Sequence, residues 1–151
     1  MKAMNPIAAW LNEISMNYGV ALSLDENQSC RFVINGESKV YVYADTAGES
    51  FWLNVKVMDV PAQEQTCLFR RALKLNLFQQ QTYGASLAFD EQSNTLLLST
   101  CRKVSESGCQ QFQNMLKNLS EVATEIRSSL SQSQQIQTAQ TSFNPLLMLS
   151  A

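Results

Sequence analysis

The cysteines are the residues of this chain with the most versatile chemistry, and they are Cys30, Cys67, Cys101 and Cys109. A thiol becomes a nucleophile or a metal ligand when a nearby cation or a helix N-terminus lowers its pKa. Cys67 lies near the start of a predicted helix, but no histidine or lysine is close to it in the sequence. Because no CxxC pair is present either, we expect reduced thiols that mostly pack in the interior.

Carboxylates are the second group that could do chemistry, as general acids, general bases or metal ligands. They gather at Asp25-Glu26, at Asp90-Glu91 and at Glu121 with Glu125. The first two pairs lie in predicted turns, where acidic side chains favour solvent and local backbone hydrogen bonds. The third pair lies on the exposed face of a predicted helix. Catalytic carboxylates need partial burial to shift a pKa, and these patterns predict none.

Further chemistry is limited by what the chain lacks. It contains no histidine, which removes histidine-dependent triads, most zinc sites and the usual proton shuttle near neutral pH. It also contains no glycine-rich phosphate loop of the nucleotide-binding types. We therefore expect a protein that is not an enzyme, with no catalytic residue, no cofactor and no metal.

The composition predicts one folded domain. The chain has 151 residues, of which 45% are hydrophobic, enough to bury a core. Its 11 basic and 13 acidic residues give a net charge of −2, and the basic residues are scattered. Nucleic-acid binding needs a clustered positive surface, so we expect none. Neither a secretory signal nor a membrane-spanning run is visible, so we expect a cytoplasmic location without membrane insertion.

The first helix is predicted from the residues that begin and end it. Asn5 is a favoured N-cap residue, Pro6 fits the first helical position, and Gly19 suits a left-handed C-terminal residue. Between them one apolar stripe repeats every three or four residues, formed by Ile7, Trp10, Leu11, Ile14 and Tyr18.

Alternating apolar residues predict the strands, because side chains of a strand point to its two faces in turn. The candidate strands are Val20–Leu24, Cys30–Ile34, Val40–Ala44, Phe51–Met58, Ala85–Phe89 and Asn94–Thr100. Helical periodicity predicts a central helix from Gln63 to Gln79 and a last helix from Ser105 or Ser107 to Ser131. The order is helix, three or four strands, helix, two strands, helix. It predicts an α+β fold with a mostly antiparallel, twisted sheet flanked by helices.

The end of the chain differs in composition from the rest. Residues 132–144 are mostly Gln, Ser and Thr, which bury too little apolar surface to offset chain ordering. An apolar patch follows at Phe143–Leu149. We therefore expect a single α+β domain over residues 1–131 and a Gln/Ser-rich flexible tail over residues 132–151.

Two surfaces carry more apolar residues than a single core requires. The central helix has one face with Leu68, Ala72 and Leu75 and another with Phe69, Leu73 and Leu77. Its own sheet would cover one face, and a second copy of the chain would cover the other. The strands also place Tyr41, Tyr43, Trp52 and Met58 opposite the residues assigned to the core. Helices of the same chain, a dimer mate or an extended peptide are alternative covers for that sheet face.

The segment Cys67–Thr100 contains a Leu-rich helix ending in Asn, a Gly-marked turn, a strand ending in Asp, and an apolar strand. This pattern resembles the class I chaperones of bacterial type III secretion, the Tir-chaperone-like (CesT/SycE-like) family. The order of elements from about Asn5 to Ser131 also matches that family. A central turn with only Gly84 and the long Gln/Ser tail depart from it. The matching positions are Leu68, Phe69, Ala72, Leu73, Asn76, Gly84, Leu87, Asp90, Leu96 and Leu98.

The resemblance implies a homodimeric, ATP-independent chaperone of the bacterial cytoplasm. Such a protein binds an extended N-proximal segment of a secreted effector and keeps the effector soluble and competent for export. On this chain we expect effector-binding pockets on the first helix and first strands, at Trp10, Ile14, Leu22, Phe32, Ile34 and Val42. We expect the dimer contact on the central helix and the strand before it, at Val55, Val57, Leu68, Leu75 and Phe78.

Two other function classes remain open at this point. One is a non-secretory regulatory or scaffold module with the same fold, similar to the YbjN-type proteins. The other is a cofactor-free enzyme. A stable dimer that takes up an extended peptide favours the chaperone, a dimer without an apolar groove favours the regulatory module, and turnover of a substrate favours the enzyme.

Overall fold

The computed structural model describes the backbone of residues 5–141 and the side chains of residues 5–132. Five strands form one sheet in the order β1-β2-β3-β5-β4, and every neighbouring pair is antiparallel. The predicted α+β fold with an antiparallel sheet and flanking helices is confirmed. The elements are α1 (Pro6–Tyr18), β1 (Ser29–Ile34), β2 (Ser38–Ala44), β3 (Ser50–Asp59), η1 (Ala62–Glu64), α2 (Gln65–Asn76), β4 (Ser86–Asp90), β5 (Thr95–Lys103), η2 (Val104–Glu106) and α3 (Cys109–Thr141).

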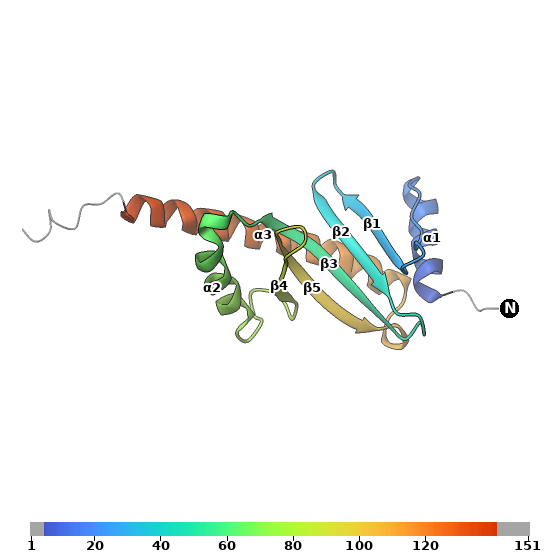
Figure 1. Cartoon of the computed structure of the whole chain (residues 1–151). Helices are drawn as coiled ribbons and strands as arrows, with labels where there is room; N and C mark the ends of the chain where they lie inside the picture. Colours follow the sequence, from blue (N-terminus) through green and yellow to red (C-terminus); the bar gives the residue numbers. More distant parts are fainter. Residues whose placement is uncertain (1–4, 142–151) are drawn as a thin grey trace, which may run out of the picture.

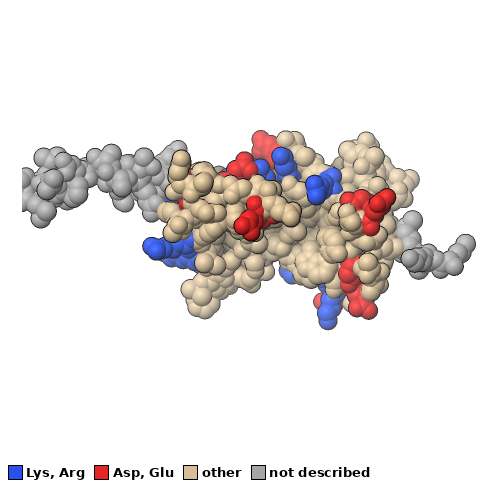
Figure 2. All heavy atoms as spheres, in the orientation of Figure 1, with Lys and Arg blue, Asp and Glu red and all other residues tan. Residues whose placement is uncertain are grey.

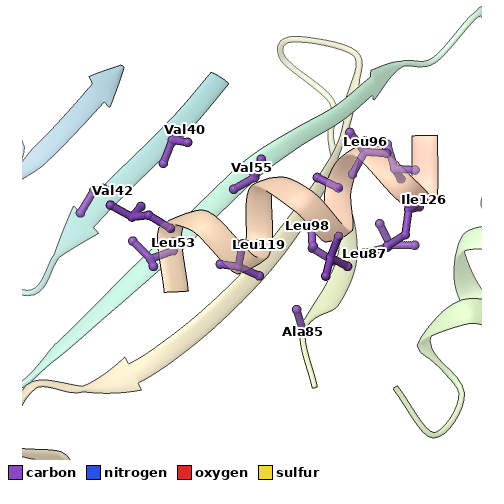
Figure 3. Packing of buried hydrophobic residues seen from close by; sticks show 14 of the residues in the cluster. Val40, Val42, Leu53, Val55, Ala85, Leu87, Leu96, Leu98, Leu119 and Ile126 are labelled. Atoms are coloured by element: carbon purple, nitrogen blue, oxygen red, sulfur yellow. The ribbon is translucent and has the colours of Figure 1, made fainter. Parts of the chain in front are cut away.

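The core lies between one face of the sheet and α3, which runs behind the sheet in Figure 1. Alternate residues of the central strands point toward this helix, as strand periodicity requires. Figure 3 shows Val42, Leu53 and Leu98 on the sheet facing Leu119 on α3. All four of these side chains are buried. We call this helix-covered side the inner face of the sheet.

Helix α1 begins and ends at the predicted residues. The Asn5 side chain accepts a hydrogen bond of 3.0 Å from the Ile7 amide, and Pro6 follows as the first helical residue. Gly19 ends the helix with φ of +66°, a conformation that costs glycine little. Trp10 then anchors α1 to the core, with its ring 5.8 Å from that of Phe51 and 5.6 Å from that of Phe112.

Helix α2 is attached to the sheet edge at β4. The Asn76 side chain donates to the Leu87 carbonyl at 3.0 Å and accepts from the Leu87 amide at 2.7 Å. This double hydrogen bond satisfies both backbone groups of one residue on the edge strand. The rings of Phe69 and Phe89 pack beside it with centroids 4.6 Å apart. The last residue of α2 therefore fixes where the helix lies relative to the sheet.

Several predicted boundaries differ from the structure. The segment 20–24 is not a strand, because Leu22 hydrogen-bonds through both backbone groups to the Ser15 hydroxyl instead of to a neighbouring strand. The central helix ends at Asn76 rather than Gln79, since Phe78 and Gln79 have φ of +63° and +51°.

The last helix also departs from its prediction, since α3 continues past Ser131 to Thr141. The glutamines that follow Ser131 are good helix formers, although they supply little apolar surface. Residues 142–151, which include the apolar patch Phe143–Leu149, lie outside the described residues. The division into a domain and a flexible tail stays a prediction. Among the described helices, none has the length and apolarity needed to cross a membrane.

We predict that Asn76→Ala destabilises the protein by about 1–3 kcal/mol, because it leaves two buried backbone groups of Leu87 without their partner. Thermal or urea unfolding measures the change. Asn114→Ala is the matched control, since Asn114 is an exposed helical residue that bonds only another exposed side chain in the described part of the chain. Equal stability of the two variants would contradict the anchoring role of Asn76.

Candidate functional site

The acidic turn residues act as backbone caps. Asp25 accepts hydrogen bonds from the amides of Asn27 and Ser29 and from the Ser29 hydroxyl, at 2.8, 3.0 and 2.9 Å. The bond from the Ser29 amide contributes most to holding the pKa of Asp25 below its ordinary value. Asp90 has a lowered pKa for a similar reason, chiefly its bond from the Ser93 hydroxyl. The hydrogen bonds stabilise the charged carboxylates and so lower their pKa values, and a charged carboxylate suits a cap and not a proton donor.

The thiols are dispersed rather than clustered. Burial raises the pKa of Cys30, which lies in the core, and burial also raises the pKa of Cys109. The Cys109 thiol contacts the Trp10 carbonyl at 3.9 Å, so its neighbours are those of a packed residue. Within residues 5–132, no three His, Cys, Asp or Glu side chains come together in a way that would hold a metal ion.

An apolar groove of about 380 Å³ lies between α1, β1 and the first half of α3. Four of the residues predicted to bind an effector line it: Ile14, Leu22, Phe32 and Ile34. The sequence prediction did not include its other lining residues, which are Tyr18, Val20, Val33, Asn35, Gln113, Leu116 and Lys117. Lys117 is the single charged residue of this set. We call this hollow the α1–β1 groove.

Local structure explains why the α1–β1 groove exists. Strand β1 is at the edge of the sheet, and α3 covers its Phe32 and Ile34 only in part. Gly19 turns the chain away from α1, and the Ser15–Leu22 hydrogen bonds hold the next segment as the wall of the groove. Tyr18, Val20 and Val33 are 69%, 48% and 53% exposed. The groove is therefore apolar and open to solvent.

Two of the predicted effector-binding residues lie elsewhere. Val42 is 1% exposed on the inner face of the sheet, so in a single chain it belongs to the core. Trp10 is half-buried in the aromatic cluster with Phe51 and Phe112 and does not line the α1–β1 groove. Strand and helix periodicity assigned both residues to the right faces. Periodicity does not predict which residues of a face another helix or strand buries.

A second apolar surface lies on and after α2, and we call it the α2 surface. It consists of four exposed side chains, Leu73, Leu77, Phe78 and Tyr83, with exposed fractions of 70%, 64%, 82% and 74%. Leu75 lies partly buried beside them. Of the predicted dimer contacts, Phe78 and Leu75 are accessible here. Val55, Val57 and Leu68 are at most 1% exposed and belong to the core of a single chain.

The outer face of the sheet, turned to the viewer in Figure 1, carries no helix of the described residues. Tyr43 packs on Trp52 with ring centroids 5.4 Å apart, and the Arg31 guanidinium lies 5.7 Å from the centre of the Tyr41 ring. Figure 2 shows this face with positive and negative residues interspersed around uncharged surface. Its aromatic residues cover one another, which reduces their need for a partner.

A larger hollow of about 460 Å³ lies between α3, β5 and the turn before β4. Its rim carries Arg102, Glu121 and Glu125, and its lining includes the buried Thr82. Among the described residues, the Thr82 hydroxyl has no hydrogen-bond partner. Because charges of both signs surround it, this hollow suits an extended apolar segment less well than the α1–β1 groove does.

Sequence comparison relates most of the chain to one known family. A family model described as the Tir chaperone protein (CesT) family matches residues 9–127. Among curated protein sequences, none matches the chain.

Solved structures share the fold. A chain of the crystal structure of the ExsC-ExsE complex is 19% identical with a TM-score of 0.72, covering 85% of this chain and 96% of that chain. A chain of the structure of the Yersinia pestis type III secretion chaperone SycH in complex with a stable fragment of YscM2 is 17% identical with a TM-score of 0.58. The match covers 78% of this chain and 97% of that chain. A chain of the heterodimeric complex ExoU-SpcU from the type III secretion system of Pseudomonas aeruginosa is 14% identical with a TM-score of 0.59. The match covers 81% of this chain and 95% of that chain.

We predict that the thiols react in the order of their exposure. Cys101 is exposed and should react with a disulfide reagent in the folded protein at mildly alkaline pH. Cys30 should react only on unfolding, because it is buried and burial raises the pKa of its thiol. Cys67 and Cys109 are partly exposed and should react at intermediate rates. Absorbance of the released thiolate follows the reaction. Cys101→Ser should remove the fastest phase, and reaction of Cys30 in the folded protein, located by mass spectrometry, would contradict its packing role.

Proposed function

Because the chain belongs to the Tir chaperone protein (CesT) family, we propose that it is an ATP-independent chaperone for type III secretion. It binds an extended N-proximal segment of a secreted effector in the bacterial cytoplasm and keeps the effector soluble and competent for export. Its role is binding and not catalysis. The family match favours this function over a non-secretory regulatory or scaffold module of the same fold.

The α1–β1 groove is the observation that carries the proposal. It is open, nearly uncharged and lined by Ile14, Leu22, Phe32 and Ile34. An extended peptide places alternate side chains on one side, so a short segment would insert an apolar side chain at every second residue. The neighbouring edge strand β1 offers backbone groups that a peptide strand can pair with. The proposed effector-binding residues are therefore these four, with Tyr18, Val20 and Val33 at the opening.

Burial supplies the driving force for such a complex. Apolar surface removed from water stabilises the bound state by roughly 25 cal/mol per Å², before the cost of ordering the peptide. Phe32 is the largest partly buried side chain of the groove, and large anchors usually carry a disproportionate share of the binding energy. Lys117 is the only charge in the lining, so electrostatic attraction contributes little.

The α2 surface supports a second part of the proposal, a homodimer. Leu73, Leu77, Phe78 and Tyr83 are exposed in the single chain, although apolar side chains of this size favour burial. A two-fold axis would let the same surface of each copy cover the other. The dimer contact is proposed at these residues together with Leu75.

We predict that Phe32→Ala weakens binding of an N-terminal effector fragment by on the order of 1–3 kcal/mol, because it removes the largest anchor of the groove. Raising the salt concentration from about 0.1 to about 0.5 M should change the affinity only slightly, because a nearly uncharged groove has little charge to screen. Calorimetry on co-purified candidates measures both. Tyr43→Ala, an exposed aromatic on the outer face of the sheet, is the control. A folded Phe32→Ala protein with unchanged affinity would place the effector elsewhere.

We predict that Phe78→Asp converts the dimer to a folded monomer. It places a charge in the proposed contact, and it also fits the backbone, since Phe78 has φ of +63° and Asp tolerates this conformation better than Phe. Light scattering gives the mass, and circular dichroism checks the fold. Met16→Asp is the control, because Met16 is 78% exposed on α1, away from α2. A wild-type chain that is already monomeric would refute the dimer.

A further inference from the structure

We propose that the apolar segment Phe143–Leu149 of one copy binds in the α1–β1 groove of another copy when no effector is present. This inference rests on the proposed function, because it assigns a regulatory occupant to the same groove. The protein would then carry its own competitor for the effector, supplied by the part of the sequence that follows α3.

The chemistry of the segment matches the groove. Residues 143–149 read FNPLLML and contain five large apolar side chains and no charge. The segment therefore brings no ionised group of its own that would have to be desolvated on burial. The preceding residues 132–142 are mostly Gln, Ser and Thr, so the apolar residues of this region are concentrated in one short stretch.

Pro145 adds a conformational match. A proline disfavours helical backbone in the residue before it and favours extended backbone there. Extended backbone is the form that inserts alternate side chains and lies along an edge strand. The groove is built for that form, since it follows the end of β1 at Phe32, Val33 and Ile34.

The length of α3 decides which copy supplies the segment. Lys117 lines the groove, and α3 continues to Thr141, leaving the body beyond α2 in Figure 1. A helix rises about 1.5 Å per residue, so roughly 36 Å separate Lys117 from Thr141. An extended chain covers at most about 3.6 Å per residue, so Leu149 lies within about 29 Å of Thr141. The segment is therefore too short to return to the groove of its own chain.

Binding between copies would have a functional consequence. It would cover Tyr18, Val20 and Val33, which are exposed in the empty groove, and so protect a free chaperone from non-specific association. An effector segment would have to displace the segment of the neighbouring copy. Effectors that bind more tightly than this internal competitor would be selected.

Photo-crosslinking of the full chain tests the inference without any effector. The exposed groove residue Val33 is replaced by p-benzoylphenylalanine, and a mixture of ¹⁵N-labelled and unlabelled chains is refolded together before irradiation. We expect crosslinks from position 33 to residues 143–149 that join a labelled chain to an unlabelled one. An excess of the synthetic peptide of residues 142–151 should remove them.

Two controls keep the outcome decisive. The same photoreactive residue at Tyr43, on the outer face of the sheet, should give no crosslink to residues 143–149. In the full chain, Leu147→Asp together with Leu149→Asp should abolish the crosslink from position 33. Neither residue belongs to the groove lining, so the substitutions leave the lining side chains unchanged.

The possible results separate the inference from the proposed function. Crosslinks confined to a single chain would overturn binding between copies, and no crosslink to residues 143–149 would overturn the inference as a whole. In the second case an effector fragment that still depends on Phe32 would leave the proposed function standing. If residues 143–149 occupy the groove but no effector fragment ever competes with them, the proposed function fails and the contact between copies remains.

Discussion

The arrangement of this protein depends on one constraint, the coverage of a five-stranded sheet by a single helix. Helix α3 covers the inner face along β2, β3 and β5, and the apolar side chains of those strands are buried against it. A helix is only about 10–12 Å wide including side chains, whereas adjacent strands lie about 4.8 Å apart. The edge strands β1 and β4 therefore extend beyond it. Helices α1 and α2 fill these margins and leave part of their own surface open.

Helix α2 at the β4 edge and helix α1 at the β1 edge pack against the sheet in different ways. The two edges therefore offer different kinds of surface to a partner. At the β4 margin, Asn76 holds both backbone groups of Leu87 and fixes α2, which leaves Leu73 on the helix and Phe78 after it exposed. At the β1 margin no side chain of α1 pairs with the strand, so a hollow remains over Phe32 and Ile34. Exposed apolar side chains on and after α2 suit a partner with an apolar surface of its own, such as a second copy. The α1–β1 groove suits a narrow, extended partner.

Much of the fold follows from local sequence rules, because caps and alternation act over short distances. Asn5 and Gly19 bound α1 as expected, and the period of two placed Phe32 and Val42 on the same face. Local rules do not predict which part of a strand face a distant helix covers. Phe32 lies at the margin and Val42 beneath α3, a difference set by the path of a helix far along the chain. The left-handed backbone of Phe78 and Gln79 is equally absent from the sequence pattern, so helical periodicity predicts an end for α2 that is three residues too late.

Helix α3 also joins the two open surfaces, since Lys117 lines the groove and the Leu130 carbonyl accepts a hydrogen bond from Arg71 on α2. That bond measures 3.4 Å, near the limit at which a hydrogen bond still contributes, and α2 has its own strong attachment through Asn76. A small shift of α3 at the groove would therefore move α2 little. The β4 edge therefore fixes the position of α2 through Asn76, whereas the path of α3 sets how much of the groove beside β1 stays open.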